Sequence, residues 1–395
     1  MPASSLPTGR WVITWTAMPQ LTEPDNMPPP PYAKEGLTLA DTTLRQTLRV
    51  SLGGGRLRLR LSNAFGGAPL PITRVAVALP SGGAAGVSGI RPETSRPVTF
   101  SGRPHATVPA GAHVVSDPLD LDLAPGTVLA VTVHLADGLA SSALTSHPGS
   151  RTTSHLATGD HVHAADLPAA TPVDHWYLLS GVEVRAGADA AAVVLLGDSL
   201  TDGRGSTTNG NDRWPDRLFD RLPPGVAVAN QGAGGNRVLN DGLGPSALAR
   251  LDRDVLAQSA ARWLVVFEGV NDLGTAPATR DAQRQVVEEL IAAYEQIAVR
   301  ARARDLLVYG ATLTPFGGSD PYDDPEGHRE EARQAVNAWI REAGAYDAVI
   351  DFDLAVRDPA APRRLAAAYD EGDHLHLSPA GYRALAEAVP LTLFQ

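Results

Sequence analysis

The chain has 395 residues, of which 43% are hydrophobic and 19% are charged, and its formal net charge is −11. This composition is typical of a globular protein with a sizeable core, and the length favours two domains. The negative charge argues against nucleic acid and anionic membrane surfaces as partners, and the absence of cysteine excludes disulfides, a thiol nucleophile and thiolate metal sites.

No apolar stretch reaches the roughly 20 residues that span a membrane, so we expect no membrane insertion. The first residues, Met1–Ser5, lack the basic start and apolar core of a signal peptide. We therefore expect either a secreted protein whose leader is absent from this sequence or a cytoplasmic protein. The sequence gives no indication of the oligomeric state.

The first half of the chain alternates short apolar runs with turn residues. Residues 56–61 alternate strictly between arginine and leucine, as a half-buried strand does. Further strands are expected at 72–79, 128–135 and 176–184, with glycine- and proline-rich turns between them. Repeated short strands without amphipathic helices predict an all-β sandwich domain over residues 1–187.

After residue 187 the pattern changes to alternating strands and helices. Strands are expected at 192–196, 226–229, 264–267, 306–309 and 348–352, and helices at 214–222, 246–258, 280–304, 326–342 and 379–389. This alternation predicts a parallel sheet with helices on both faces, an α/β domain over residues 188–395. In such sheets, catalytic groups gather at the carboxyl ends of the strands.

Four polar segments follow strands of this sheet or occupy its last loop: Gly197-Asp198-Ser199-Leu200, Asn230-Gln231-Gly232-Ala233-Gly234-Gly235, Gly269-Val270-Asn271-Asp272 and Asp373-His374-Leu375-His376. A serine hydroxyl becomes a nucleophile when a base removes its proton and a third group orients that base. A backbone amide at a glycine and an asparagine side chain can stabilise an oxyanion. The Gly-x-Ser-x-Gly elbow of α/β-hydrolases is absent, since Thr201 takes its last place.

In this order the four segments resemble the conserved blocks of the GDSL-type esterases, the SGNH hydrolase superfamily. The resemblance spans the second half of the chain and implies a flavodoxin-like three-layer α/β/α domain. It implies that Ser199 is the nucleophile, that His376 is the general base and that Asp373 is its partner. It also implies that the amides of Ser199 and Gly235 and the side chain of Asn271 form the oxyanion hole. We expect the carboxylate of Asp373 to raise the pKa of His376.

Three segments of the first half, Trp11–Trp15, Thr43–Gln46 and Arg60–Gly66, are similar to the front module of a two-domain esterase subfamily. Its members are described as xylanase-esterase-like or lysophospholipase-like. In that subfamily a β-sandwich precedes the catalytic domain, which agrees with the division into 1–187 and 188–395. The role of this module is not readable from its residues.

Polar and aromatic residues near the nucleophile are candidates for substrate contact. We assign Asp198, Arg204 and Trp214 to this role, although Asp198 has the alternative role of a helix cap. Other aromatic residues stand where loops can meet a sugar: Phe316, Tyr322 and Tyr369.

Histidine pairs allow two alternative interpretations. His374 also lies in the last loop and competes with His376 as the base, but the spacing in the family selects His376. The pairs His161/His163 and His374/His376 have a spacing that metal sites can use. No clustered carboxylates or further histidines accompany them, so we expect no metal, and a triad of this kind requires no cofactor.

These features predict a serine ester hydrolase that cleaves short-chain acyl esters, in particular acetyl esters, on a carbohydrate or another small molecule. No long apolar loop surrounds the four segments to hold a long acyl chain. Two alternatives remain open: a lysophospholipase or general lipid acyl hydrolase, and, from another class, a carbohydrate-binding protein with a vestigial catalytic half.

Overall fold

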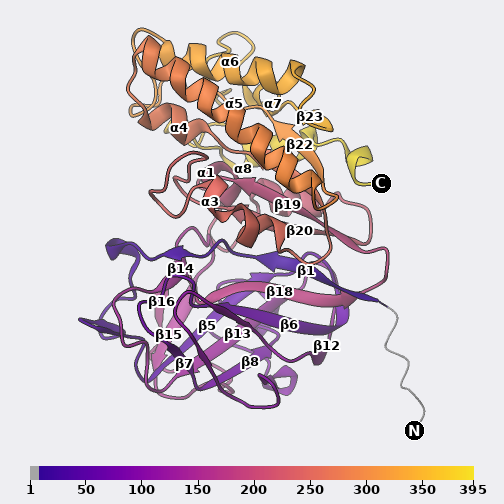
Figure 1. Cartoon of the computed structure of the whole chain (residues 1–395). Coiled ribbons are helices and arrows are strands. Elements are labelled where there is room, and N and C mark those ends of the chain that lie inside the picture. Colours follow the sequence, from indigo (N-terminus) through magenta and orange to yellow (C-terminus); the bar gives the residue numbers. More distant parts are fainter. Residues whose placement is uncertain (1–8) are drawn as a thin grey trace. The chain divides into compact units, whose positions relative to one another are not determined.

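The computed structural model describes residues 9–395 (Figure 1), so the expectation about Met1–Ser5 lies outside the described residues. The chain divides into two compact units. The first extends to Ala192 and includes Thr208–Gly210, and the second comprises Val193–Thr207 and Asn211–Gln395. The division falls a few residues after the boundary that we expected at 187. None of the helices in residues 9–395 combines the length and hydropathy needed to span a bilayer.

Strands dominate the first unit. Its longer sheets contain β1 (Arg10–Thr16), β5 (Thr42–Arg49), β6 (Gly54–Ser62), β8 (Arg74–Ala78), β9 (Arg96–Val98), β11 (His113–Val115), β12 (Leu119–Leu123), β13 (Val128–Leu135), β15 (Ser154–Thr158), β16 (Thr171–Val173) and β18 (Leu179–Ala186). Shorter elements are β2 (Gln20–Leu21), β3 (Ala33–Lys34), β4 (Leu37–Thr38), β7 (Leu70–Ile72), β10 (Ala106–Val108), β14 (Thr145–His147), β17 (Trp176–Tyr177), η1 (Pro24–Asn26), η2 (Ser81–Gly83) and η3 (Pro92–Thr94).

Two antiparallel sheets form most of this unit. One has the order β1-β18-β6-β11, with β12 also paired to β6, and the other has the order β16-β15-β5-β13-β8-β9. In β6 the leucines of the alternating segment are fully buried, whereas Arg58 and Arg60 point to the other face and pair with Glu183 of β18. The strand-rich first half is confirmed, while the packing of its sheets as a sandwich stays a prediction.

The second unit alternates strands and helices, as the sequence predicts. Its strands are β19 (Ala191–Gly197), β20 (Val226–Gly232), β21 (Ala261–Phe267), β22 (Leu307–Ala311) and β23 (Ala348–Ile350). Its helices are α1 (Ser199–Asp202), α2 (Trp214–Phe219), α3 (Ala247–Leu251), η4 (Asp252–Leu256), α4 (Val270–Thr275), α5 (Arg280–Arg302), α6 (His328–Glu342), α7 (Phe352–Val356), α8 (Pro379–Ala388) and η5 (Leu391–Phe394).

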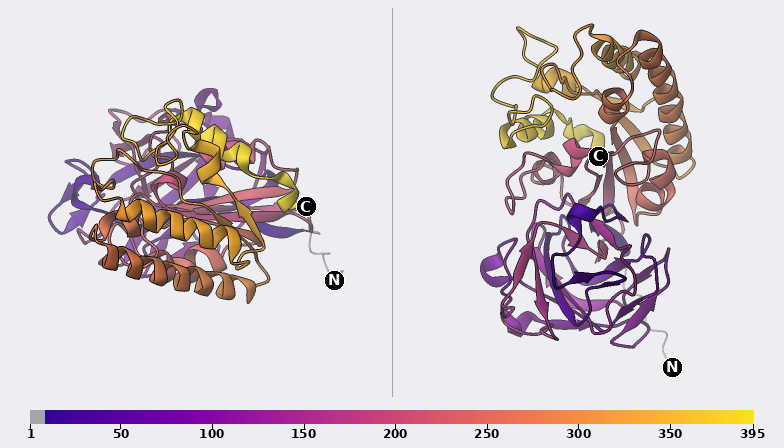
Figure 2. Two further views of the ribbon diagram at one scale, coloured as in Figure 1. Left: turned by 90° about the horizontal axis from the view of Figure 1, so that it is seen from above. Right: turned by 90° about the vertical axis from the view of Figure 1, so that its left-hand side faces the viewer.

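The strands of this unit form one sheet in the order β20-β19-β21-β22-β23, and β21, β22 and β23 pair in parallel. In the left view of Figure 2, α8 lies on one side of these strands and α5 and α6 lie on the other. The unit is thus a three-layer α/β/α domain, with the strand order 2-1-3-4-5 of flavodoxin-like folds. Every residue of β19 is buried, because helices cover both faces of such a sheet.

Most element boundaries shift by a few residues from the expected ones, and two of the differences have a clear structural form. The helix expected at 246–258 is the short α3 followed by the π-helical turn η4. The strand expected at 348–352 ends at Ile350, because the side chain of Asp351 accepts a hydrogen bond from Leu354 and caps α7.

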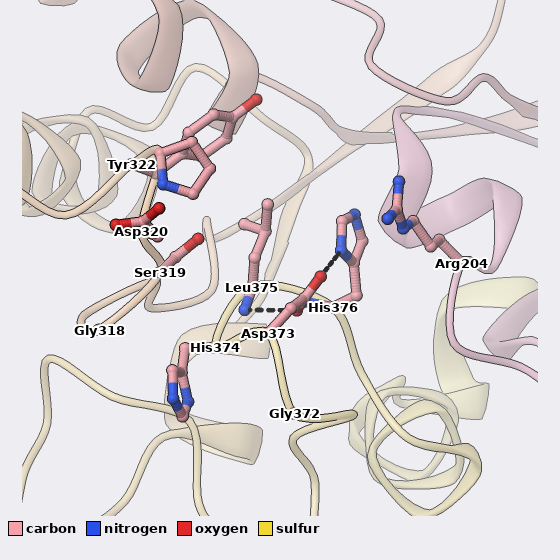
Figure 3. A pocket seen from close by; sticks show the side chains of 11 residues that line it. Arg204, Gly318, Ser319, Asp320, Tyr322, Gly372, Asp373, His374, Leu375 and His376 are labelled. Carbon is pink, nitrogen blue, oxygen red and sulfur yellow. Dashed lines mark hydrogen bonds and ion pairs between the residues drawn. The ribbon is translucent and has the colours of Figure 1, made fainter.

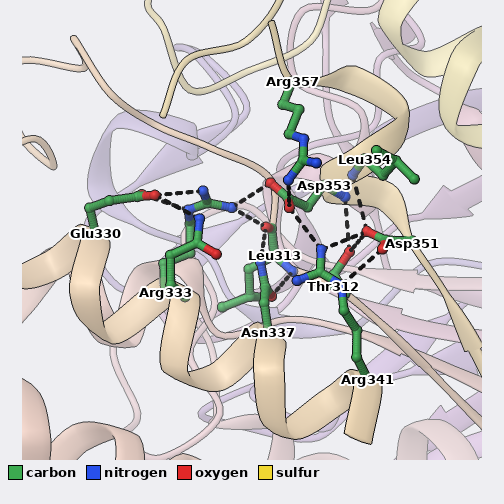
Figure 4. A network of polar contacts seen from close by, with 11 residues as sticks. Thr312, Leu313, Glu330, Arg333, Asn337, Arg341, Asp351, Asp353, Leu354 and Arg357 are labelled. Carbon is green, nitrogen blue, oxygen red and sulfur yellow. Dashed lines mark hydrogen bonds and ion pairs between the residues drawn. The ribbon is translucent and has the colours of Figure 1, made fainter. Parts of the chain in front are cut away.

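A buried charge network fixes the chain after β22 (Figure 4). Asp353 accepts hydrogen bonds from Arg333 at 2.7 Å, from Arg341 at 2.8 Å and from Arg357 at 3.1 Å. Arg333 also donates to the carbonyl of Leu313 at 2.8 Å. Charge-assisted bonds of this kind are strong when both partners are satisfied. The network anchors the start of the loop that follows β22, which contributes to the site described next.

Candidate active site

Ser199 lies at the junction of β19 and α1. It is the first residue of the helix, and Asp198 before it caps the helix by accepting a hydrogen bond from the Leu200 amide at 2.9 Å. An amide at this position has no carbonyl partner within its own helix. The strand end therefore presents both the hydroxyl and the amide of Ser199 for interactions outside the helix.

Asp373 and His376 come from the loop before α8 and meet this serine. The Nε2 atom of His376 lies 2.8 Å from Ser199 Oγ, and its Nδ1 atom lies 2.6 Å from Asp373 Oδ2. The other carboxylate oxygen, Oδ1, accepts the backbone amides of Leu375 at 3.0 Å and His376 at 2.8 Å (Figure 3). Asp373 thus fixes both the loop and the imidazole, so that Nε2 faces the hydroxyl.

Burial and hydrogen bonding act in opposite directions on the pKa values of His376 and Asp373. Desolvation lowers the pKa of His376 below its usual 6.5 and outweighs the hydrogen bond and charge of Asp373, which act in the opposite direction. Asp373 thus acts in the expected direction, but the net pKa of His376 is lowered rather than raised, because the expectation left out desolvation. For Asp373, burial favours the protonated form, but the bonds from His376 prevail and the pKa lies below its usual value.

The segments after β20 and β21 are joined by a hydrogen bond. Gly235 adopts a left-handed conformation with φ of 69°, which favours glycine because other residues are strained there. The Asn271 side chain, on α4, donates from Nδ2 to the carbonyl of Asn236 at 2.7 Å. This bond connects the start of α4 to the residue that follows Gly235.

A fully buried arginine on α3 links the strand ends beneath these segments. Arg250 donates to the carbonyls of Gly197 at 3.1 Å and Gln231 at 2.8 Å, and to Asn236 Oδ1 at 2.9 Å. It also lies 3.4 Å from the Glu268 carboxylate. Since these partners follow or end β19, β20 and β21, Arg250 holds together the three strand ends that present the candidate site residues.

Three carboxyl groups in the segments after β19 and β21 are buried: Asp198, Glu268 and Asp272. Burial raises the pKa of Asp198 to about 7, that of Glu268 to about 8 and that of Asp272 to about 6. Asp272 nevertheless accepts the backbone amides of Val238 and Leu239 at 2.8 and 2.9 Å. The cluster therefore acts as a scaffold for the loop after β20, and Asp198 serves as the helix cap.

A cavity of about 410 Å³ opens beside Asp373 and His376. Its polar lining includes Arg204, Ser319, Asp320, Tyr322 and His374. In Figure 3, Ser319, Asp320 and Tyr322 lie on one side of the Asp373–His376 pair and Arg204 lies on the other. The hydroxyl of Tyr382 on α8 donates to the carbonyl of Arg204 and so fixes its backbone. The cavity can hold a small polar group next to the imidazole.

Of the three residues assigned to substrate contact, only Arg204 lines this cavity. Trp214 is fully buried, with its ring against Phe352 and its Nε1 atom 3.3 Å from Thr201 Oγ1. Asp198 is also buried and caps α1. The assignment of Trp214 and Asp198 to substrate contact is therefore corrected, because their side chains point into the domain.

The remaining histidines of the two pairs have separate partners. His374 is half exposed and its Nδ1 atom lies 2.5 Å from Asp370 Oδ2. His163 Nδ1 lies 2.9 Å from Ser95 Oγ, and His161 Nε2 lies 2.9 Å from the Thr158 carbonyl. Among residues 9–395, no three or more histidine and acidic side chains are grouped so that they could hold a metal ion.

Sequence reasoning missed two contacts that support the candidate site. The hydroxyl of Tyr322 donates to Asn271 Oδ1 at 2.6 Å, and Arg250 connects the strand ends. From the sequence, Tyr322 is only one aromatic residue in a loop. No motif around Arg250 distinguishes it from other helical arginines. Both roles depend on tertiary placement.

Residues 195–384 match the model of the GDSL-like Lipase/Acylhydrolase family. No curated protein matches the chain. Among solved structures, a GDSL-like lipase from Bacteroides thetaiotaomicron is 19% identical with a TM-score of 0.37, covering 50% of this chain and 84% of that one. An acetyl xylan esterase is also 19% identical with a TM-score of 0.37, covering 50% of this chain and 96% of that one.

Proposed function

We propose that this carboxylic ester hydrolase, whose residues 195–384 belong to the GDSL-like lipase/acylhydrolase family, uses Ser199 as nucleophile, His376 as general base and Asp373 as the partner of that base. The observation that carries the proposal is the series of contacts from Ser199 Oγ to His376 Nε2 at 2.8 Å and from His376 Nδ1 to Asp373 Oδ2 at 2.6 Å. Acyl transfer through a serine requires a nucleophile, a base and an orienting carboxylate within hydrogen-bonding distance of one another.

In the first half of the reaction, Ser199 Oγ attacks the ester carbonyl while His376 Nε2 accepts the hydroxyl proton. The carboxylate of Asp373 stabilises the resulting imidazolium. The carbonyl oxygen becomes an oxyanion, for which the amides of Ser199 and Gly235 and the side chain of Asn271 are the proposed donors. When the intermediate collapses, the C–O bond to the alcohol breaks and His376 returns its proton to the leaving oxygen.

The acyl group is then attached to Ser199. A water molecule gives a proton to His376 Nε2 and attacks the acyl carbon, and the same donors stabilise the second oxyanion. Collapse releases the carboxylic acid and returns the proton to Ser199 Oγ. Atoms and charges balance without a cofactor.

For the substrate, we propose short acyl esters, in particular acetyl esters carried by a carbohydrate or a similar polar alcohol. The cavity beside His376 is small, about 410 Å³, and its lining residues include Arg204, Asp320 and Tyr322. Charged and aromatic groups of this kind suit a polar alcohol better than a long alkyl chain. A lysophospholipase activity remains the alternative.

The test measures kcat/KM for a series of nitrophenyl esters from acetate to C12, followed by acetate release from acetylated xylo-oligosaccharides. The proposal expects the highest kcat/KM with acetate and measurable release from the oligosaccharide. A maximum at C8 or longer would favour the lipid alternative. The absence of turnover across the series would contradict the assignment of the site and favour a binding protein with a vestigial catalytic half.

A further inference from the structure

The side-chain amide of Asn271 is held on two sides. Its Nδ2 atom donates one hydrogen bond to the Asn236 carbonyl at 2.7 Å, and its Oδ1 atom accepts a hydrogen bond from the Tyr322 hydroxyl at 2.6 Å. An asparagine amide has two N–H donors and one carbonyl acceptor. After these two bonds, one N–H remains for a ligand, and its direction is determined by the other two contacts.

The chemistry of the partners fixes which atom is nitrogen and which is oxygen. The carbonyl of Asn236 can only accept a hydrogen bond, so the amide nitrogen must face it. A flipped amide would set two carbonyl oxygens 2.7 Å apart at that position. On the opposite side, the Tyr322 hydroxyl donates to the oxygen.

The ring of Tyr322 packs against α4 and Phe316. Its ring lies over Gly274 of α4, where a Cβ atom would come within 2.6 Å of three ring atoms. Phe316 contacts the ring edge-on, with centroids 6.2 Å apart. The absence of a side chain at Gly274 therefore allows the ring to approach the helix that carries Asn271, close enough for the hydroxyl to reach Oδ1.

We propose that Tyr322 is a positioning residue for the oxyanion hole. Its hydroxyl orients and polarises the Asn271 amide, and its ring packs against Gly274. The proposal rests on the role of Asn271 as an oxyanion donor in the proposed function. A hydrogen bond accepted by the amide oxygen draws electron density from the nitrogen and makes the remaining N–H a stronger donor. The bond is also made before substrate binds, which is the preorganisation that oxyanion stabilisation requires.

The hydroxyl stays a donor under ordinary assay conditions. Burial raises the pKa of Tyr322 to about 12, so the phenol is protonated throughout the neutral range. The contribution of Tyr322 is therefore expected to be independent of pH across that range.

The experiment compares the full-length chain with Tyr322→Phe, Asn271→Ala and the double variant, with nitrophenyl acetate as substrate. Loss of one hydrogen bond that acts through Asn271 should lower kcat about three- to tenfold, with KM changed less than about twofold. In the Asn271→Ala background, Tyr322→Phe should change kcat less than about twofold, because its only route to the oxyanion has been removed.

Two further variants separate positioning from general stability. Tyr309→Phe removes a hydroxyl that donates to the Leu393 carbonyl at 2.6 Å in the same domain, and it should leave kcat within about twofold of the starting protein. Gly274→Ala removes no polar atom but displaces the Tyr322 ring, so it should reproduce the kcat loss of Tyr322→Phe. Melting temperatures of all variants check that each one is folded.

The outcomes distinguish this inference from the proposed function. If Asn271→Ala lowers kcat strongly while Tyr322→Phe leaves it unchanged, the positioning role is wrong and the proposed function stands. If the two effects add fully in the double variant, or if Tyr322→Phe changes mainly KM, Tyr322 acts on the substrate and the inference is also overturned. If Asn271→Ala leaves kcat unchanged, the oxyanion assignment fails and the inference fails with it.

Discussion

Ser199 Oγ and His376 Nε2 lie 2.8 Å apart although 177 positions separate the two residues in the chain. The end of β19 carries the serine and the loop before α8 carries the histidine, so the contact forms only when the second unit is folded. Asp373 lies three residues earlier in the same loop, and its carboxylate accepts hydrogen bonds from both the ring and the backbone amide of His376. The geometry of the proposed base therefore depends on a single compact loop.

Ser199→Ala should abolish almost all turnover, because it removes the atom that we propose attacks the ester. Rates some 10³–10⁴-fold above the uncatalysed reaction can persist in such variants through the oxyanion donors and binding alone. The check is a serine-directed organophosphonate: mass spectrometry should find the adduct on Ser199 in the starting protein and no adduct in the variant. An adduct on another serine would contradict the assignment.

Asn271→Ala should lower kcat by about 10² to 10³, or roughly 3–4 kcal/mol in the barrier, as the loss of one oxyanion donor typically does. KM should change much less, because the charge that this donor meets develops in the transition state. Steady-state kinetics with nitrophenyl acetate measures both constants. An effect confined to KM would mean that Asn271 binds the ground-state substrate.

The sequence predicts the fold of the second unit because its strands are continuous apolar runs. The fully buried β19 and the Leu264–Phe267 segment of β21 have this pattern, and the polar segments follow their carboxyl ends. The residues proposed for the triad could be named in advance because the four polar segments resemble the blocks of the GDSL-type esterases, and that resemblance implies their roles.

Side-chain direction and burial could not be predicted in the same way. Trp214 follows a polar loop, and no local pattern indicates that its ring turns into the core against Phe352. The lowered pKa of His376 results from desolvation, which depends on how neighbouring segments cover the ring. The bond from Tyr322 to Asn271 joins residues 51 positions apart and requires a glycine at position 274.

The pH dependence of kcat/KM should follow His376. As a base it must be neutral in the free enzyme, so kcat/KM should rise with pH through a pKa below the usual 6.5 and remain level above it. Asp373→Asn removes the group that favours the imidazolium, so the rising limb should move to still lower pH. Its kcat should fall as well, by up to about 10⁴ in a comparable triad. A rising limb that moves to higher pH in Asp373→Asn would contradict the effect of the Asp373 carboxylate on the pKa of His376.

Arg204→Gln should move the rising limb of the kcat/KM profile to higher pH. The positive charge of Arg204 lowers the pKa of His376, so its removal should raise that pKa and shift the rising limb to higher pH. Arg304→Gln is the matched control, since Arg304 is exposed and does not line the cavity. Profiles of kcat/KM against pH for both variants provide the measurement. Equal shifts in the two variants would point to overall charge rather than to Arg204.

The choice between the two histidines of the last loop can be tested by replacing each with asparagine. Asparagine suits position 374, where φ is 61°, because it tolerates the left-handed region better than most residues. His376→Asn should lose nearly all activity, since its Nε2 is the atom 2.8 Å from Ser199 Oγ. His374→Asn should keep the pH midpoint of the starting protein, because the His374 ring pairs with Asp370 and is half exposed. If His374→Asn were the inactive variant and His376→Asn kept the normal profile, the assignment of the base would be wrong.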